Sequence, residues 1–304
     1  MPYPDFLIIG AAKSGTSALY RYIRQHPEIY MSPVKEPHFF GYENAPPNSQ
    51  GPGDFVNTAI TDLDTYLKLF EQIGSERAIG EASPTYLYLP GAAERIHHHI
   101  PQAKLIAILR QPADRAFSAY MHVVRDQRET ELSFSEALAL EEDRIAQNWG
   151  PIWHFKRMGL YHEQLARYYR RFEQGQIRVY IYDDFSKDPI GIVQDIFRFL
   201  DVDDNFVPDM RLRANVSGKP RSKLASDVMD LFFAKPNPVR YFARRLIPEN
   251  LRWQFTTSVR NHNLSRQTIP PYVRRELTDY FRTDIEQLQE LIGRDLAMWL
   301  AQQM

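Results

Sequence analysis

The residues with the clearest chemistry form a glycine loop close to the N-terminus. The run Gly10-Ala11-Ala12-Lys13-Ser14-Gly15-Thr16-Ser17 stands between a short apolar stretch at 6–9 and a helical pattern that ends before Pro27. At such a junction of strand, loop and helix, backbone N–H groups and the positive helix end converge on one point. We therefore predict an anion site built from these residues: Ala12, Lys13, Ser14, Gly15, Thr16 and Ser17.

This loop departs from the pattern G-x-x-x-x-G-K-[ST] of nucleotide triphosphatases. The residue after Gly15 is Thr16, and the lysine lies inside the loop as Lys13. The apolar run at 105–109 is followed by Arg110 and not by an aspartate suited to hold Mg²⁺. We expect a shorter, monophosphate-type anion in the loop and no metal ion.

A second anionic group has its own candidate ligands. Arg110 follows the apolar run at 105–109, at the carboxyl end of an expected central strand, where ligands bind in open α/β sheets. Ser118 lies within two turns of the helix that Pro112 opens. A guanidinium and a hydroxyl in these positions are suited to share a phosphate distinct from the one at the loop.

Strands and helices, which must position these residues, are expected to alternate along the chain. Alternating strands and helices predict a parallel sheet covered on both faces. The fold class is α/β, a P-loop-like three-layer fold with a central parallel sheet flanked by helices, and we expect one domain over 1–304. We predict strands at 6–9, 78–80, 105–109 and 177–182, and helices at 19–23, 112–124, 161–172, 190–200 and 273–292.

Composition narrows the kinds of partner. The chain has no cysteine, which excludes disulfides, thiolate metal sites and a cysteine nucleophile. A net charge of -1 gives no general attraction to nucleic acid. The sequence has neither a basic leader nor an apolar stretch of about 18 residues. We expect a cytoplasmic protein with a small-molecule or glycan partner, and we make no prediction of its oligomeric state.

Two separate phosphate sites, no metal and a lysine within the loop describe a ligand such as 3'-phosphoadenosine 5'-phosphate. At this point the sequence resembles the family of sulfotransferases that use 3'-phosphoadenosine-5'-phosphosulfate (PAPS), in the branch of heparan-sulfate-type and bacterial carbohydrate sulfotransferases. The resemblance rests on the glycine loop and on Leu109-Arg110-Gln111-Pro112 with Arg115, Ser118 and Tyr120. Further matches are Lys35-Glu36-Pro37-His38-Phe39-Phe40, Gly80-Glu81-Ala82-Ser83-Pro84-Thr85-Tyr86, Gly159-Leu160-Tyr161 and Tyr182-Asp183-Asp184-Phe185.

The resemblance implies transfer of a sulfuryl group from PAPS to a hydroxyl, or alternatively an amine, by metal-free in-line displacement. The acceptor would be a carbohydrate, a glycolipid or a secondary metabolite. Lys13 would stabilise charge on the leaving phosphate. The resemblance assigns the general base to Glu36, with a pKa raised by partial burial, whereas the ordinary pKa of His38 makes that residue a competing base.

Other residues are candidates for binding the acceptor or closing the nucleotide site. Lys35 is suited to contact the acceptor, and we expect the same of Glu81, Ser83 and Tyr86, which follow the strand at 78–80. In the family a late basic glycine loop closes over the 3'-phosphate. The matching residues here are Gly218, Lys219 and Arg221.

Three alternatives stay open at this stage. A P-loop kinase or NTPase would require Mg²⁺ and a lysine directly after Gly15. A non-catalytic module would bind 3'-phosphoadenosine nucleotides without needing Glu36. Residues 228–260 mix aromatic and arginine side chains, so they form either a peripheral membrane surface or core packing with a lid over the acceptor. We expect His122 to be structural, and we expect the run 97–99 to lie at the surface.

Overall fold

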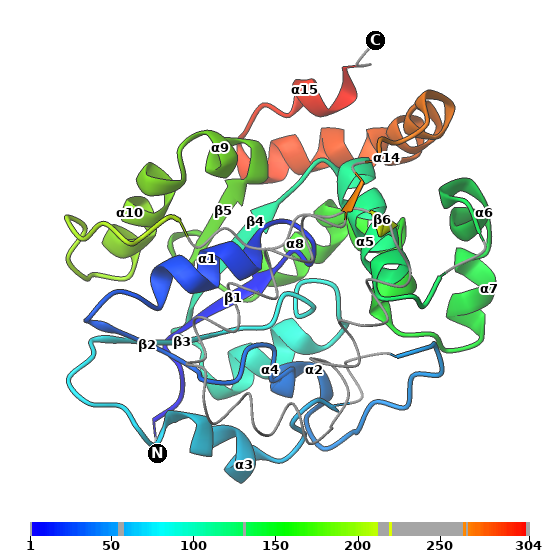
Figure 1. The fold of residues 1–304 in the computed structure, drawn as a ribbon. Coiled ribbons are helices and arrows are strands. Elements are labelled where there is room, and N and C mark those ends of the chain that lie inside the picture. The colour runs from blue at the N-terminus through cyan, green and yellow to red at the C-terminus, as the bar shows by residue number, and fades with distance from the viewer. Residues whose placement is uncertain are drawn as a thin grey trace.

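A five-stranded parallel sheet forms the centre of the computed structural model (Figure 1). The structure describes residues 2–53, 58–129, 132–211, 219–220, 264–265 and 267–301. The strand order is β2-β3-β1-β4-β5. The strands are β1 (Phe6–Gly10), β2 (Ile29–Met31), β3 (Ala78–Ala82), β4 (Lys104–Leu109) and β5 (Ile177–Ile181). The predicted fold class, a P-loop-like α/β fold with a parallel sheet between helices, is confirmed.

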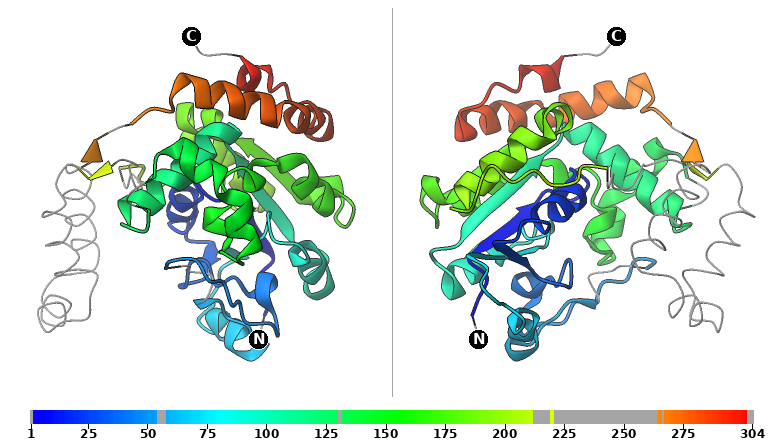
Figure 2. Two further views of the ribbon diagram at one scale, coloured as in Figure 1. Left: turned by 90° about the vertical axis from the view of Figure 1, so that its right-hand side faces the viewer. Right: turned by 60° about the vertical axis from the view of Figure 1, so that its left-hand side comes forward.

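The two faces of the sheet bury different side chains because successive residues of a strand point to opposite sides. Leu7 and Leu105 belong to one core, whereas Phe6 and Ile106 belong to the other. The first core packs beneath α4 (Ala92–His99), α5 (Pro112–Arg125), α8 (Tyr161–Tyr169) and α14 (Pro271–Ile292). The second core packs beneath α1 (Thr16–Ile23) and α10 (Pro189–Phe199), and Figure 2 shows these layers from two further sides.

Shorter helices complete the chain around these layers. The α-helices are α2 (Phe39–Tyr42), α3 (Leu63–Leu67), α6 (Phe134–Ala139), α7 (Glu141–Ala146), α9 (Tyr182–Lys187) and α15 (Ala297–Leu300). The 3₁₀-helices are η2 (Lys68–Phe70), η3 (Pro151–Trp153), η4 (Arg157–Gly159) and η5 (Gln174–Gln176).

Two strand predictions differ from the structure in ways that affect the site. The strand predicted at 78–80 continues to Ala82, so Glu81 lies inside β3 and not after it. The strand predicted at 177–182 ends at Ile181, and Tyr182 begins α9. The edge strand β2 was not predicted, because its three residues are too few to show a hydrophobic period.

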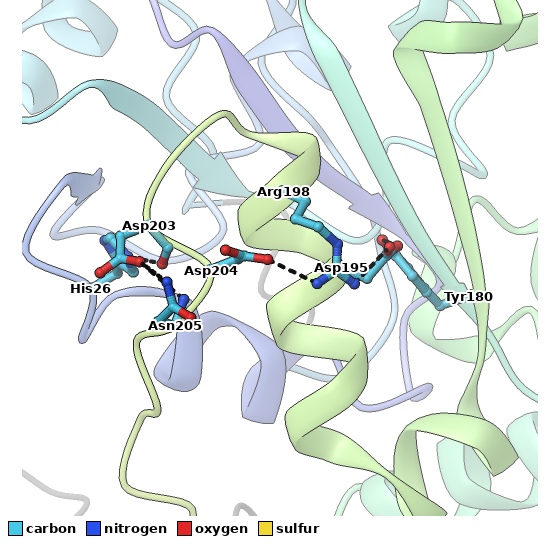
Figure 3. A network of polar contacts seen from close by, with 7 residues as sticks. All are labelled: His26, Tyr180, Asp195, Arg198, Asp203, Asp204 and Asn205. Carbon is cyan, nitrogen blue, oxygen red and sulfur yellow. Dashed lines mark hydrogen bonds and ion pairs between the residues drawn. The ribbon is translucent and has the colours of Figure 1, made fainter.

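A polar network ties α10 and the segment after it to α1 and β5 (Figure 3). Beyond the end of α1, the ring Nε2 of His26 lies 2.8 Å from the carbonyl oxygen of Asp203. Tyr180 of β5 donates to Asp195 at 2.7 Å, and Arg198 pairs with the same carboxylate at 3.3 Å. The helices on this face are thereby held in place relative to the glycine loop at the start of α1.

Candidate active site

The glycine loop turns sharply between β1 and α1. Lys13 and Gly15 have positive φ angles of 72° and 96°. The amide of Ala11 donates to Ile108 of β4 at 2.8 Å, which fixes the start of the loop on the sheet. Within the described residues no side chain caps α1. The first amides of a helix have no acceptor within it, so those of Thr16 and Ser17 are suited to bind an anion.

Gly15 cannot be replaced without strain, for two reasons. Its positive φ lies in the left-handed region that favours glycine. A Cβ atom at this position would lie 3.0 Å from the ring of Tyr182, which packs directly against the loop. Tyr182 was not predicted as a site residue, although its place at the end of the strand predicted at 177–182 was a usable signal.

Arg110 lies beside the loop. Its guanidinium carbon stands 4.9 Å from the centre of the Tyr182 ring, and its Nη1 lies 3.5 Å from the carbonyl oxygen of Lys13. Ser118 is a buried residue of α5. Arg115, part of the same sequence match, instead donates to the carbonyl oxygen of Phe155 and holds that segment against α5.

A second tyrosine supports the Arg110 part of the anion site. The hydroxyl of Tyr161 donates to the carbonyl oxygen of Arg110 at 3.0 Å. Asp284 of α14 accepts from the amides of Tyr161 and His162 at 2.8 and 3.1 Å and so caps α8. Burial raises the pKa of Asp284 to about 6. The role of Asp284 depends on residues far apart in the sequence, so no local pattern predicted it.

The candidate bases lie between β2 and α2 in an unusual backbone conformation. Glu36 and His38 have φ angles of 63° and 58°, in the left-handed region that non-glycine residues rarely adopt. Glu36 forms an ion pair with Lys35, and its Oε2 lies 3.9 Å from the Nε2 of His38. The other ring nitrogen of His38 lies 2.9 Å from the hydroxyl of Thr85. Glu36 is 39% exposed in its side chain and His38 only 4%.

The pKa expected for Glu36 was wrong in direction. Burial acts to raise the pKa of this carboxyl, but the ion pair and hydrogen bond with Lys35, with His38 and Lys13 nearby, outweigh it and lower the pKa. Burial also lowers the pKa of His38. Burial lowers the pKa of Lys13 to about 7, and the positive charge of Arg125 adds to the effect.

The predicted acceptor contacts at Glu81, Ser83 and Tyr86 need correction. All three residues are fully buried. Ser83 donates to the carboxylate of Glu81 at 2.9 Å, so these groups contact one another rather than open space. The prediction failed because lying at the carboxyl edge of a sheet does not say how deeply a side chain is covered.

The last turn of α5 adds charged residues that the sequence analysis did not include. The charges of Arg125 and Asp126 both act on the pKa of Lys13, which places this turn beside the loop. The Nη2 of Arg125 lies 2.7 Å from the Nδ1 of His122, and its Nε donates to Asp126 at 2.8 Å. Ser118, His122 and Arg125 are spaced to share one face of a helix, a signal that was available.

The predicted basic loop is described only at Lys219. Gly218 and Arg221 lie outside the described residues, as does the range 228–260. Lys219 lies in β6 (Lys219–Pro220), which pairs with β7 (Leu264–Ser265) and contacts α5. The closing of this loop over a 3'-phosphate stays a prediction.

Glu81 makes the stability of the fold depend on pH. Burial raises its pKa to about 7 in the folded protein, whereas the unfolded value is about 4.3. The folded state therefore keeps a proton that the unfolded chain releases, and a contribution of about 4 kcal/mol is lost as the pH rises from about 4 to about 7. We expect Glu81→Gln to flatten this part of the stability profile. Urea unfolding of both proteins across this range measures the effect, and parallel profiles would contradict it.

Known proteins are similar to this chain in sequence and in fold. The family profile described as "Sulfotransferase family" matches residues 4–206. The crystal structure of a sulfotransferase from Alicyclobacillus acidocaldarius superposes with a TM-score of 0.79, with 39% identity over 99% of this chain and 100% of that one. Among the described residues, no helix has both the length and the apolar character needed to cross a lipid bilayer.

Curated relatives match over part of their length. The chain is 23% identical to the membrane-associated sulfotransferase kil1 of Dictyostelium discoideum over 83% of this chain and 66% of that protein. It is 29% identical to human heparan sulfate glucosamine 3-O-sulfotransferase 6 over 65% of this chain and 52% of that protein. The chain thus spans about half to two thirds of the length of these relatives.

Proposed function

The chain belongs to the sulfotransferase family, and from this premise we propose that it transfers a sulfuryl group from PAPS to a hydroxyl of an acceptor. One observation carries the proposal: Arg110 stands beside a glycine loop that contains its own lysine, and Tyr182 packs against both. These groups come from the ends of adjacent strands, where α/β sheets bind ligands. An amine as acceptor group is the alternative. A cytoplasmic location and a single domain stay predictions of the sequence.

The donor groups present suit a nucleotide with two separate phosphates. Helix amides and Lys13 supply donors and charge at the loop, and Arg110 supplies a planar donor set beside it. When bound, PAPS supplies the sulfuryl group and a phosphate as leaving group. Lys13 and the amides of Gly15, Thr16 and Ser17 would stabilise charge on that phosphate. Arg110 with Ser118 would hold the 3'-phosphate, and Gly218, Lys219 and Arg221 would cover it.

On the acceptor side, we assign the general base to Glu36. Its carboxylate is partly exposed, whereas the ring of His38 is buried behind it and contacts Thr85. His38 would therefore orient Glu36. Lys35 would contact the acceptor or the sulfuryl oxygens once the acceptor displaces it from the carboxylate. We propose a carbohydrate, a glycolipid or a secondary metabolite as the acceptor, because fold and donor site do not determine what the variable loops admit.

The proposal is tested by incubating the protein with ³⁵S-labelled PAPS and panels of glycans, glycolipids and phenols, with and without EDTA. We expect labelled product in at least one panel and the same rate in EDTA. A strict requirement for Mg²⁺ with turnover of ATP would favour the kinase or NTPase alternative. Binding of 3'-phosphoadenosine 5'-phosphate (PAP) without transfer to any acceptor would favour the non-catalytic module.

Arg110→Ala should weaken the binding of PAP. The substitution removes charged hydrogen bonds to a phosphate, which contribute about 1.5–3 kcal/mol, so we expect the Kd to rise about 10- to 150-fold. Isothermal titration calorimetry measures the Kd directly. Arg282→Ala is the control, because Arg282 is an exposed residue of α14 paired with Asp279. An unchanged Kd in Arg110→Ala would remove Arg110 from the site.

A further inference from the structure

The buried carboxylate of Glu81 lies behind the candidate base. Glu81 is fully buried near the end of β3 and accepts hydrogen bonds from two hydroxyls. Ser83 donates at 2.9 Å and Tyr66 at 3.5 Å. The side chain of Tyr86 lies close enough to act on the pKa of Glu81 as well. A buried carboxyl needs such donors because burying it without hydrogen bonds would be costly.

The hydroxyls of Ser83 and Tyr86 also contact the segment that carries Glu36 and His38. The oxygen of Ser83 accepts from the amide of His38 at 3.1 Å. The oxygen of Tyr86 accepts from the amide of Phe40 at 3.3 Å. A hydroxyl has one proton and two lone pairs, and an ionised carboxylate only accepts. Ser83 gives its proton to Glu81, so its lone pairs face the amide of His38, and the oxygen of Tyr86 likewise faces the amide of Phe40.

The segment from Glu36 to His38 needs such support. A non-glycine residue in the left-handed region costs about 1–3 kcal/mol and persists only when its surroundings enforce it, and both Glu36 and His38 are of this kind. The amide of Glu36 donates to the carbonyl oxygen of Ala82 at 2.9 Å. Together with His38 and Phe40, every second amide of this segment is bonded to β3 or to the turn after it.

We propose that Glu81 is a positioning residue for sulfuryl transfer: through the hydroxyls of Ser83 and Tyr86 it holds the backbone that presents Glu36 and His38 to the acceptor. The inference rests on the function proposed above. In this proposal Glu81, Ser83 and Tyr86 support the segment that carries the base and do not contact the acceptor. Tyr66 contacts the same carboxylate, but none of its hydrogen bonds in the described residues reaches the 36–40 segment.

Single hydroxyl deletions test this role. Ser83→Ala and Tyr86→Phe each remove one link to the segment, and Tyr66→Phe removes the hydroxyl without such a link. Because a misplacement of about 1 Å can cost about 100-fold in rate, we expect kcat to fall about 10- to 100-fold in the first two variants. We expect the KM for PAPS and the Kd for PAP to stay unchanged, Ser83→Thr to restore kcat, and Tyr66→Phe to keep the wild-type kcat.

Hydrogen exchange gives a readout that is independent of activity. Mass spectrometry should show faster exchange of the amides of 36–40 in Ser83→Ala and Tyr86→Phe and no change in Tyr66→Phe. Full kcat and unchanged exchange in both linked variants would overturn the inference, and so would an equal loss of kcat in Tyr66→Phe. If Ser83→Ala does not fold, Tyr86→Phe decides, since it keeps the ring. A wild-type protein that transfers nothing from PAPS would instead remove the proposed function, before any variant is compared.

Discussion

Replacing Lys13 with alanine is expected to lower kcat for sulfuryl transfer by about 100- to 1,000-fold, the effect of losing one preorganised donor at a site where charge develops. Lys13 lies in the loop between β1 and α1 and has a positive φ angle. Its charge is close enough to Glu36 to lower the pKa of that carboxyl. Lys13 is thus part of the anion loop and acts on the candidate base, a position from which a cation would stabilise the leaving phosphate. The amides of α1 and the guanidinium of Arg110 remain, so the Kd for PAP should change much less than kcat.

Comparing the loss in rate with the loss in affinity shows whether Lys13 acts in catalysis or only in binding. Single-turnover transfer from labelled PAPS gives the rate, and calorimetry with PAP gives the affinity. Lys187→Ala, which alters an exposed residue of α9, should behave like the wild type. The loss should be the same in EDTA and in excess Mg²⁺. Equal losses in affinity and in kcat/KM, with kcat unchanged, would instead make Lys13 a binding residue alone.

The layers of the fold were predictable because hydrophobic periods report burial directly. The core strand β4 has five consecutive buried residues, Leu105 to Leu109, and α5 shows a full helical period after Pro112. The edge strand β2 has three residues and gives no such signal. The extension of β3 through Glu81 was missed because a glutamate normally ends an apolar run, and only the surrounding hydroxyls make its burial possible.

The parts of the site that follow strands were also predictable, since parallel strands deliver their carboxyl ends to one edge. Lys13 and Arg110 come from such positions, and the contact between Arg110 and the carbonyl oxygen of Lys13 places them together. Glu36 follows β2, which was not predicted, so only the family resemblance pointed to it. The residues that hold them were not predictable. Asp284 reaches Tyr161 across 123 positions of the chain, and only tertiary packing brings the two together.

The lowered pKa of Glu36 shows how a local contact can reverse an expectation drawn from burial. The neighbouring Lys35 was known from the sequence, but whether its side chain folds back onto Glu36 depends on the left-handed backbone between β2 and α2. An ionised Glu36 is ready to accept a proton at neutral pH. The proposed base would therefore carry its charge before the acceptor binds, with Lys35 as its partner.

Glu36→Gln should reduce kcat by about 100- to 10,000-fold, the contribution of a positioned general base. Glutamine keeps the size of the side chain and can still meet Lys35, but it cannot take the proton from the acceptor. PAP affinity should be unchanged, because the carboxylate has no place in the phosphate site. His38→Gln is the matched variant: glutamine can still meet Thr85, so we expect a smaller loss if His38 only orients Glu36.

The pH profile of kcat/KM completes the assignment of the base. With Glu36 as the proposed base, activity should fall as the pH drops through the pKa of that carboxyl, which lies below its ordinary value. Lys35→Met removes the partner that lowers this pKa, so the acidic limb should move to higher pH. A histidine base predicts a smaller shift in the same direction, because Lys35 is the least of the influences on the pKa of His38. An acidic limb that disappears in His38→Gln and persists in Glu36→Gln would transfer the role of base to His38.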